Sequence, residues 1–228
     1  MKKFLAVLLV VILCASVAVW AAAEQTNEYA VGNIVTFGSY EQDNDPGNGK
    51  EPVDWIVLES DGAKALLISE YCLDAHAYNT AFVKMTWERC TLRAWLNSDF
   101  MNEMFTPEEQ AKILSTDVVN DNNPDYGTYG GNDTVDKIYL LSFGEAYRYF
   151  PTDESRQAKP TAYAIENGAY VNEETGNTWW WLRTAGVRRI DACGVRQDGR
   201  VSGYGSRDVY RLSGTIRPVL WVSIGNAN

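Results

Sequence analysis

Short apolar segments separated by turn-forming residues are the feature that most limits how this chain can fold. The runs Val53–Leu58 and Ala63–Ser69 flank Asp61-Gly62, a dipeptide typical of a tight β-hairpin. The same texture returns after Trp179, where glycines punctuate short apolar runs up to a last segment at residues 217–222. With 8 Trp, 13 Tyr and 18 Gly, the composition favours an aromatic core built on strands and turns over a helical bundle.

The middle of the chain carries helical signals. Leu92, Trp95, Leu96 and Phe100 recur at the three- and four-residue spacing of an amphipathic helix. Capping-box patterns at residues 106–109 and 142–145 predict two further helix starts. No internal repeat or linker divides the sequence. We therefore expect a single α+β domain, with helices in the first half and strands and loops in the second.

The amino terminus has the pattern of a secretory signal peptide. Lys2 and Lys3 precede the apolar run 4–20, and small residues at 21–23 suit a signal peptidase. We predict a signal peptide at 1–23 cleaved after Ala23, a tail at 24–30 and one domain at 31–224. No later apolar stretch is long enough to span a membrane, so we expect a secreted or cell-envelope protein. A retained anchor helix is the alternative.

The charge balance argues against a nucleic-acid partner. The full chain has a net charge of -10, and loss of Lys2 and Lys3 with the leader makes it more negative. Such a body repels the phosphate backbone of nucleic acids. The 46% hydrophobic and 22% charged residues also exclude disorder of the whole chain.

Histidine and cysteine are too sparse for the common metal and nucleophile sites. His76 is the single histidine, and Cys72, Cys90 and Cys193 fit no zinc spacing. A Cys72–Cys90 bridge and three buried thiols are the two alternatives. We predict no catalytic residue and no assigned metal ligand.

The polar segment 120–134 is expected to form a long surface loop. Asp121, Asp125 and Asp133 could together hold a divalent cation, or water alone could solvate them. We assign no cofactor and leave calcium open.

Residues 187–213 stand out by their arginines. This segment has no Lys or Glu, and tyrosines lie among its arginines, a composition found at recognition hot spots. A solvated polar face is the alternative. The predicted ligand-binding residues are Arg188, Arg189, Asp191, Arg196, Arg200, Tyr204, Arg207, Asp208, Tyr210 and Arg211. The predicted buried or half-buried supports are Trp179, Trp180, Trp181, Arg183, Arg217 and Trp221.

Several segments together resemble the DUF6273 family of bacterial proteins. They are residues 38–43 (GSYEQD), 51–58 (EPVDWIVL), 86–97 (TWERCTLRAWLN), 179–183 (WWWLR) and 214–218 (GTIRP). The resemblance covers roughly residues 31–224. The family is similar to a branch of the C-type lectin-like fold, beside formylglycine-generating enzymes and the variable proteins of diversity-generating retroelements. This implies an α+β domain whose C-terminal strands and loops display a ligand-binding surface.

The resemblance implies the fold of these relatives but not their chemistry. Formylglycine-generating enzymes bind copper through a cysteine pair, whereas Cys193 stands alone in the last third of this chain. The motifs of calcium-dependent lectins are missing as well. We therefore expect a secreted or surface-exposed bacterial module that binds a protein or glycan. The alternatives are an enzyme related to formylglycine-generating proteins and a structural envelope protein.

The segment 187–213 also has the restricted composition that the retroelement-diversified relatives show. Among Lys, Glu, Gln, Met and Trp, only Gln197 occurs there. Adenine-directed mutagenesis of Asn codons of the form AAC cannot reach these five residue types. Diversification of 187–213 is one interpretation, and an ordinary polar face of a lectin-like domain is the other.

Overall fold

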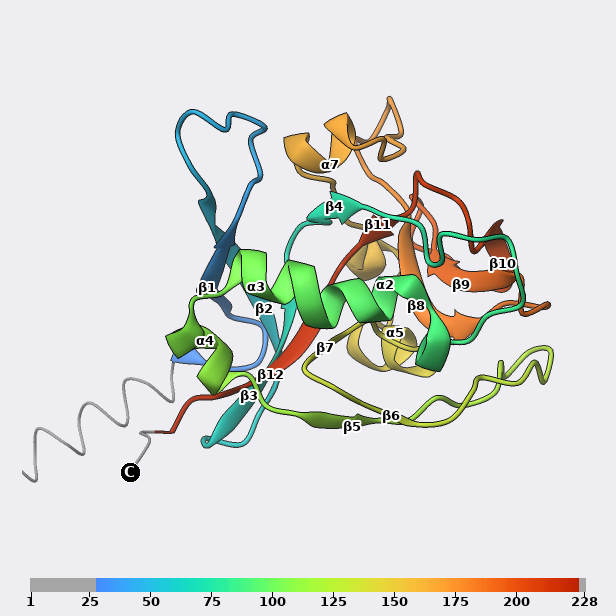
Figure 1. The fold of residues 1–228 in the computed structure, drawn as a ribbon, viewed down its shortest axis with the longest axis horizontal. Helices are drawn as coiled ribbons and strands as arrows, with labels where there is room; N and C mark the ends of the chain where they lie inside the picture. Colours follow the sequence, from blue (N-terminus) through green and yellow to red (C-terminus); the bar gives the residue numbers. More distant parts are fainter. Residues whose placement is uncertain (1–27, 226–228) are drawn as a thin grey trace, which may run out of the picture.

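Two five-stranded sheets and a series of short helices form the domain, which is a mixed α+β structure (Figure 1). The computed structural model describes residues 28–225, and the side chains of Ser206 and Arg207 are not described. The predicted signal peptide 1–23 and the tail before Glu28 therefore lie outside the described residues. No helix within 28–225 is both long and apolar enough to cross a membrane.

The first sheet has the strand order β1-β2-β3-β12-β7 and is antiparallel throughout. Its strands are β1 (Ile34–Tyr40), β2 (Glu51–Ser60), β3 (Lys64–Ser69), β12 (Val219–Ser223) and β7 (Ile138–Tyr139). The predicted turn joins β2 to β3, with Gly62 at a φ of 84°. Asp61 Oδ1 accepts hydrogen bonds from the backbone N–H of Lys64 at 2.9 Å and of Ala63 at 3.0 Å. The expected hairpin is confirmed.

The second sheet has the order β10-β9-β8-β11-β4. Its strands are β4 (Asp74–Ala75), β8 (Trp180–Ala185), β9 (Asp191–Val195), β10 (Val201–Asp208) and β11 (Thr215–Ile216). Strands β8, β9 and β10 form an antiparallel meander, and every residue of β8 and β9 is buried. Strands β8 and β9 are therefore part of the core, although β9 belongs to the arginine-rich segment 187–213.

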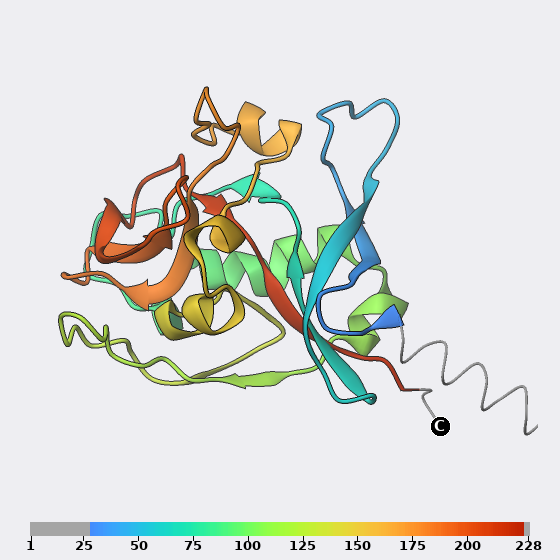
Figure 2. The same ribbon diagram turned by 180° about the vertical axis from the view of Figure 1, so that it is seen from behind.

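The connection between the last two strands joins the two sheets. Arg217 and Pro218 connect β11 of the second sheet to β12 of the first, and the connection is visible from both sides (Figures 1 and 2). Arg217 is buried, and its Nε donates to the Ser69 carbonyl at 2.9 Å. Its guanidinium lies 4.9 Å from the Phe150 ring centroid and 5.4 Å from that of Trp180. Burial lowers the pKa of Arg217.

The helices are short and extend further along the chain than expected. They are the 3-10 helix η1 (Trp87–Arg89), α2 (Thr91–Trp95), the π-helical η2 (Leu96–Phe100), α3 (Met101–Met104), α4 (Pro107–Lys112), α5 (Phe143–Tyr149), α6 (Asp153–Arg156) and α7 (Ala162–Glu166). Both predicted capping boxes are confirmed, at Thr106 with Glu109 and at Ser142 with Glu145. The expectation of helices in the first half and strands in the second was wrong in detail, because α5, α6 and α7 lie at residues 143–166. Strands β2 and β3 correspond to the predicted runs at 53–58 and 63–69.

The helical segment 86–97 contacts a small third sheet, in which β5 (Thr116–Val118) pairs with β6 (Thr134–Asp136). The buried Asp136 carboxylate accepts hydrogen bonds from Trp87 Nε1 at 2.9 Å and Arg93 Nε at 2.6 Å. Asn97 Nδ2 donates to the Ile138 carbonyl at 2.8 Å. The polar residues of segment 86–97 therefore position the stretch of chain that directly follows the long loop 119–133.

Candidate ligand-binding surface

The predicted ligand-binding residues separate into two groups at opposite ends of the β8–β10 meander. Arg196 and Arg200 flank the β9–β10 turn, which we call the turn end (residues 196–200). The remaining residues lie at the loop end, formed by residues 186–190 and 208–213, or on β10 beside it. The backbone N–H of Val209 donates to the Ile190 carbonyl at 2.9 Å, and that of Val187 to the Tyr204 carbonyl at 2.8 Å. At about 3.3 Å per residue, strand β9 separates the two ends by roughly 15 Å.

The two arginines of the turn end share one carboxylate, that of Asp198. Asp198 forms ion pairs with Arg200 at 2.6 Å and with Arg196 at 3.9 Å. Hydrogen bonding from Arg200 lowers the pKa of Asp198. The turn also packs on α6, because Arg156 Nε donates to the Gly199 carbonyl at 2.8 Å. This end is a packed hairpin turn in which each arginine has an ion-pair partner.

The loop end carries cations of two kinds. Arg188 donates to the Asp191 carboxylate through Nε at 2.8 Å and Nη2 at 3.1 Å. Asp191 was a predicted ligand contact, but it is only 4% exposed and its carboxylate is occupied by Arg188. In contrast, Arg189 and Arg211 are exposed, and within residues 28–225 neither forms an ion pair. Among the arginines of the segment whose side chains are described, the two without an ion pair therefore lie at the loop end.

An arch at residues 79–85, which the sequence did not indicate, completes this end. The backbone N–H of Asn79 donates to the Val209 carbonyl at 2.8 Å, and that of Met85 to the Arg189 carbonyl at 2.7 Å. Between these two anchors the arch exposes Phe82, Val83 and Lys84. Phe82 is 57% exposed, which is unusual for a phenylalanine in a folded domain.

The long loop 119–133 reaches the same region. Asn123 Nδ2 donates to the carbonyls of Ala185 at 2.8 Å and Gly203 at 2.7 Å, so the loop is fastened to the second sheet. The Tyr126 ring meets the Tyr204 ring edge-on, with centroids 5.8 Å apart. Both tyrosines are exposed, Tyr204 by 60%.

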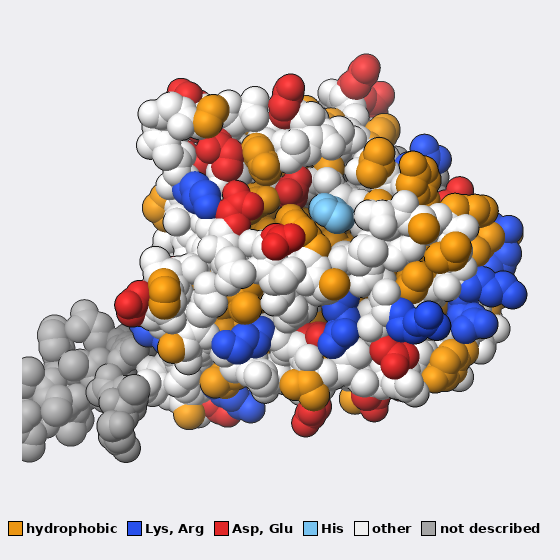
Figure 3. Space-filling view, viewed as in Figure 1, with side chains coloured by type: hydrophobic (Ala, Val, Ile, Leu, Met, Phe, Trp, Pro, Cys, Tyr) orange, Lys and Arg blue, Asp and Glu red, His pale blue; other side chains and the backbone are white. Residues whose placement is uncertain are grey.

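These segments together form what we call the composite surface, made of residues 81–84, 126, 187–189, 204 and 208–213. A hollow of about 530 Å³ opens in it, between the arch, the end of β10 and Gly168, the second residue after α7. Basic and apolar side chains gather at the end of the molecule where β9 and β10 lie (Figures 1 and 3). The hollow is lined by Phe82, Gly168, Asp208, Tyr210, Arg211, Leu212 and Ser213.

The predicted supports are buried or half-buried, and Trp221 lies on β12 of the first sheet. Trp179, Trp180 and Trp181 are buried, and Trp181 Nε1 donates to the His76 carbonyl at 2.8 Å. Arg183 is also buried and pairs with Glu145, with Nη2 to Oε1 at 2.9 Å. Trp221 is half-buried, and the Lys64 ammonium lies 4.7 Å from its ring centroid. None of these side chains is among the residues that form the composite surface.

The three cysteines of the described region are free and buried, so the Cys72–Cys90 bridge is not formed. Burial raises the pKa of Cys72 to about 11 and those of Cys90 and Cys193 to about 12. A thiol with such a pKa stays protonated at neutral pH and is a poor nucleophile.

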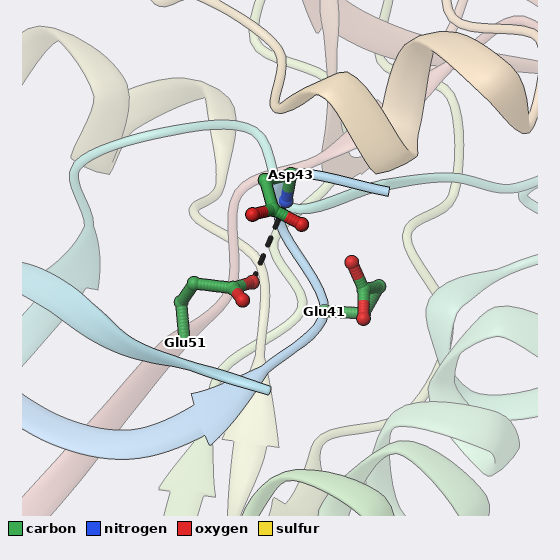
Figure 4. Close-up of side chains that lie close together, drawn as sticks. All are labelled: Glu41, Asp43 and Glu51. Atoms are coloured by element: carbon green, nitrogen blue, oxygen red, sulfur yellow. Dashed lines mark hydrogen bonds between the residues drawn. The ribbon is translucent and has the colours of Figure 1, made fainter. Parts of the chain in front are cut away.

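The acidic side chains gather elsewhere than expected. Among the described residues, Asp121, Asp125 and Asp133 form no group of close ligand atoms. Glu41, Asp43 and Glu51 do, with one carboxylate oxygen each lying within 4.8 Å of the others (Figure 4).

These carboxylates order the loop of the β1–β2 hairpin. Glu51 Oε2 accepts from the backbone N–H of Gln42 at 2.7 Å and of Asp43 at 3.4 Å. Glu41 Oε1 accepts from the backbone N–H of Asp45 at 3.0 Å. Hydrogen bonds from Asn48 and the Asp45 backbone lower the pKa of Asp43. The cluster lies at the opposite end of the molecule from the composite surface (Figure 1).

Comparison with known proteins gives one match. Residues 62–224 match the family described as "Domain of unknown function (DUF6273)". No curated protein and no solved structure matches the chain.

Proposed function

This chain belongs to the DUF6273 family, and we propose that it is a ligand-binding module whose ligand contacts the composite surface. The observation that carries the proposal is that exposed Arg211 lines one hollow together with the exposed aromatic side chains of Phe82 and Tyr210. Arginine and tyrosine dominate binding energy at protein interfaces, because they combine directional hydrogen bonds with rigid apolar area. An exposed apolar patch of this kind is typical of an interaction site.

The composite surface is held in place before any ligand arrives. The arch is fixed at both ends by backbone hydrogen bonds, and loop 119–133 is fastened through Asn123. Beneath them, β8 and β9 are wholly buried. A surface that is already ordered loses less conformational entropy on binding, which favours affinity.

The wider setting of the proposal follows from the sequence. We propose a secreted or envelope-exposed bacterial protein, on the strength of the signal-peptide pattern at residues 1–23. We also propose a C-type lectin-like fold of the formylglycine-generating branch. Retroelement diversification of 187–213 would then act through its exposed ends, since β9 is interior.

The enzymatic alternative has less support. A formylglycine-type mechanism needs reactive cysteines, whereas burial keeps Cys193 protonated with a pKa of about 12. Copper-binding measurements on the wild type and Cys193→Ser test this alternative. Stoichiometric copper that is lost in Cys193→Ser would favour the enzyme.

The binding proposal is tested on glycan and protein arrays with three forms of the mature chain. These are the wild type, the composite-surface variant Tyr204→Ser/Tyr210→Ser and the turn-end variant Arg196→Gln/Arg200→Gln. We expect the wild type and the turn-end variant to share ligands that the composite-surface variant loses, at an unchanged thermal midpoint. Ligands retained by the composite-surface variant would refute the proposal, as would arrays without any bound ligand, which would favour the structural envelope protein.

A further inference from the structure

The composite surface has an uneven charge, and this restricts its ligand. Lys84, Arg189 and Arg211 are exposed, and within residues 28–225 none of them forms an ion pair. Lys84 precedes Met85, whose backbone N–H donates to the Arg189 carbonyl at 2.7 Å, so the first two cations are neighbours. Arg211 lines the hollow together with the arch residue Phe82. Lys84 and Arg189 lie beside the hollow, since Lys84 is two residues from Phe82 and Arg189 contacts the arch through its backbone.

One carboxylate, that of Asp208, also lines the hollow. Its charge acts on Arg188: the hydrogen bonds that Arg188 donates to Asp191, followed by the negative charges of Asp191 and Asp208, raise the pKa of Arg188. Asp208 and Asp191 together thus offset Arg188, and they leave the other three cations unpaired. The net local charge at the opening stays positive.

The rest of the molecule has the opposite sign. The chain carries a net charge of -10, and acidic side chains gather around the β1–β2 hairpin and α7 (Figure 3). An acidic ligand is therefore repelled by most of the surface and attracted by the loop end. Such an arrangement steers association and fixes the orientation of the bound partner.

The walls of the hollow are apolar. Phe82, Tyr210 and Leu212 line it and are each more than half exposed, at 57%, 51% and 64%. A ligand that only carried negative charge would leave these side chains in water. The volume of the hollow, about 530 Å³, lies within the roughly 300–1,000 Å³ of small-ligand sites. The occupant must therefore bring apolar groups between its charges.

We propose that the occupant is an acidic peptide segment of a partner protein, which places apolar side chains in the hollow between Phe82, Tyr210 and Leu212 and its carboxylates against Lys84, Arg189 and Arg211. This inference rests on the proposed binding function and names the chemistry of its ligand. Burial of the apolar side chains supplies the affinity, and the flanking carboxylates supply orientation and a salt-dependent association rate.

Fluorescence anisotropy with labelled peptides tests the proposal. The probe is the peptide Glu-Glu-Leu-Phe-Glu-Glu; Lys-Lys-Leu-Phe-Lys-Lys removes the negative charge, and Glu-Glu-Gly-Gly-Glu-Glu removes the apolar centre. We expect saturable binding of the first peptide alone, at concentrations up to about 1 mM. Raising the salt concentration from about 50 to 300 mM should weaken it several-fold, because exposed charges are screened.

Matched variants locate the contact. Arg189→Gln/Arg211→Gln should raise the Kd of the acidic peptide at least about tenfold, whereas Arg196→Gln/Arg200→Gln should leave it within about twofold. All four positions are exposed arginines, so both variants should keep the wild-type thermal midpoint. Phe82→Ser should weaken binding without changing its salt dependence.

The outcomes separate this inference from the proposed function. Failure of the acidic peptide to bind, equal binding of either control peptide, or equal loss in the turn-end variant would overturn the inference. If the arrays then find a neutral glycan that requires Tyr204 and Tyr210, the binding function stands with a different ligand class. If no ligand requires these tyrosines, both proposals fall.

Discussion

Replacing Arg183 by methionine should strongly destabilise the fold, because the buried guanidinium forms an ion pair and donates to two backbone carbonyls. Arg183 is 4% exposed and donates to the carbonyls of Leu140 at 2.8 Å and Val119 at 2.9 Å. It also pairs with Glu145, whose side chain is 30% exposed. Methionine keeps most of the side-chain volume, so the loss is chiefly that of charge and hydrogen bonds.

The expected magnitude follows from what the substitution leaves behind. Removing one partner of a buried ion pair costs about 3–5 kcal/mol, because the other charge remains without compensation. The partial exposure of Glu145 places this case near 3 kcal/mol. That is a large part of the roughly 5–15 kcal/mol by which a domain is stable. Adding Glu145→Gln should recover some of the loss, since no uncompensated charge then remains.

Urea unfolding followed by tryptophan fluorescence measures this effect, because Trp180 and Trp181 are buried beside Arg183 in strand β8. Arg200→Met is the matched control, since its guanidinium is exposed and pairs with Asp198 on the surface. The control should leave the unfolding midpoint unchanged. An Arg183→Met midpoint equal to that of the wild type would show that the Arg183–Glu145 pair does not hold the second sheet.

Three further predictions concern stability and reactivity. Burial raises the pKa of Glu145, but the hydrogen bonds and the charge of Arg183 lower it by more than burial raises it. The pKa of Glu145 therefore lies below its usual 4.5. Stability should therefore fall as the pH drops from about 4.5 through the lowered pKa, and Glu145→Gln should remove this part of the acid sensitivity in urea titrations. Gly199→Ala should lower the thermal midpoint more than Gly62→Ala: φ is near 85° at both, but a Cβ at 199 would meet the Asp153 carbonyl oxygen at 1.7 Å, and one at 62 would meet nothing. The three buried cysteines should not react with a thiol reagent at pH 7 until the chain is unfolded; reaction of the native protein would contradict their burial.

Local sequence patterns predicted the local structure well. The Asp61-Gly62 hairpin and the capping boxes at Thr106 and Ser142 are confirmed. Each depends on residues a few positions apart, so sequence is sufficient to specify it. The order of helices and strands was less predictable, because two-residue strands such as β4 and β11 are too short to show any alternation.

The candidate surface depended on contacts that no local pattern encodes. Phe82 and Tyr126 lie more than seventy residues from Tyr204, and backbone hydrogen bonds from Asn79 and Met85 bring the arch to the loop end. Sequence alone also could not show which arginines lie close together in space. Strand β9 separates Arg189 and Arg196, which flank its opposite ends. The interior position of Asp191 follows from the same strand pairing.

Mapping the binding site by backbone amide chemical shifts tests the central claim most directly. The mature protein is titrated with the strongest ligand from the arrays. Shift changes should concentrate at residues 81–84, 187–189 and 204–213, with Tyr126 among them. Changes centred on the turn end at 196–200, or on the hairpin loop between Glu41 and Glu51, would contradict the claim that the composite surface is the binding site.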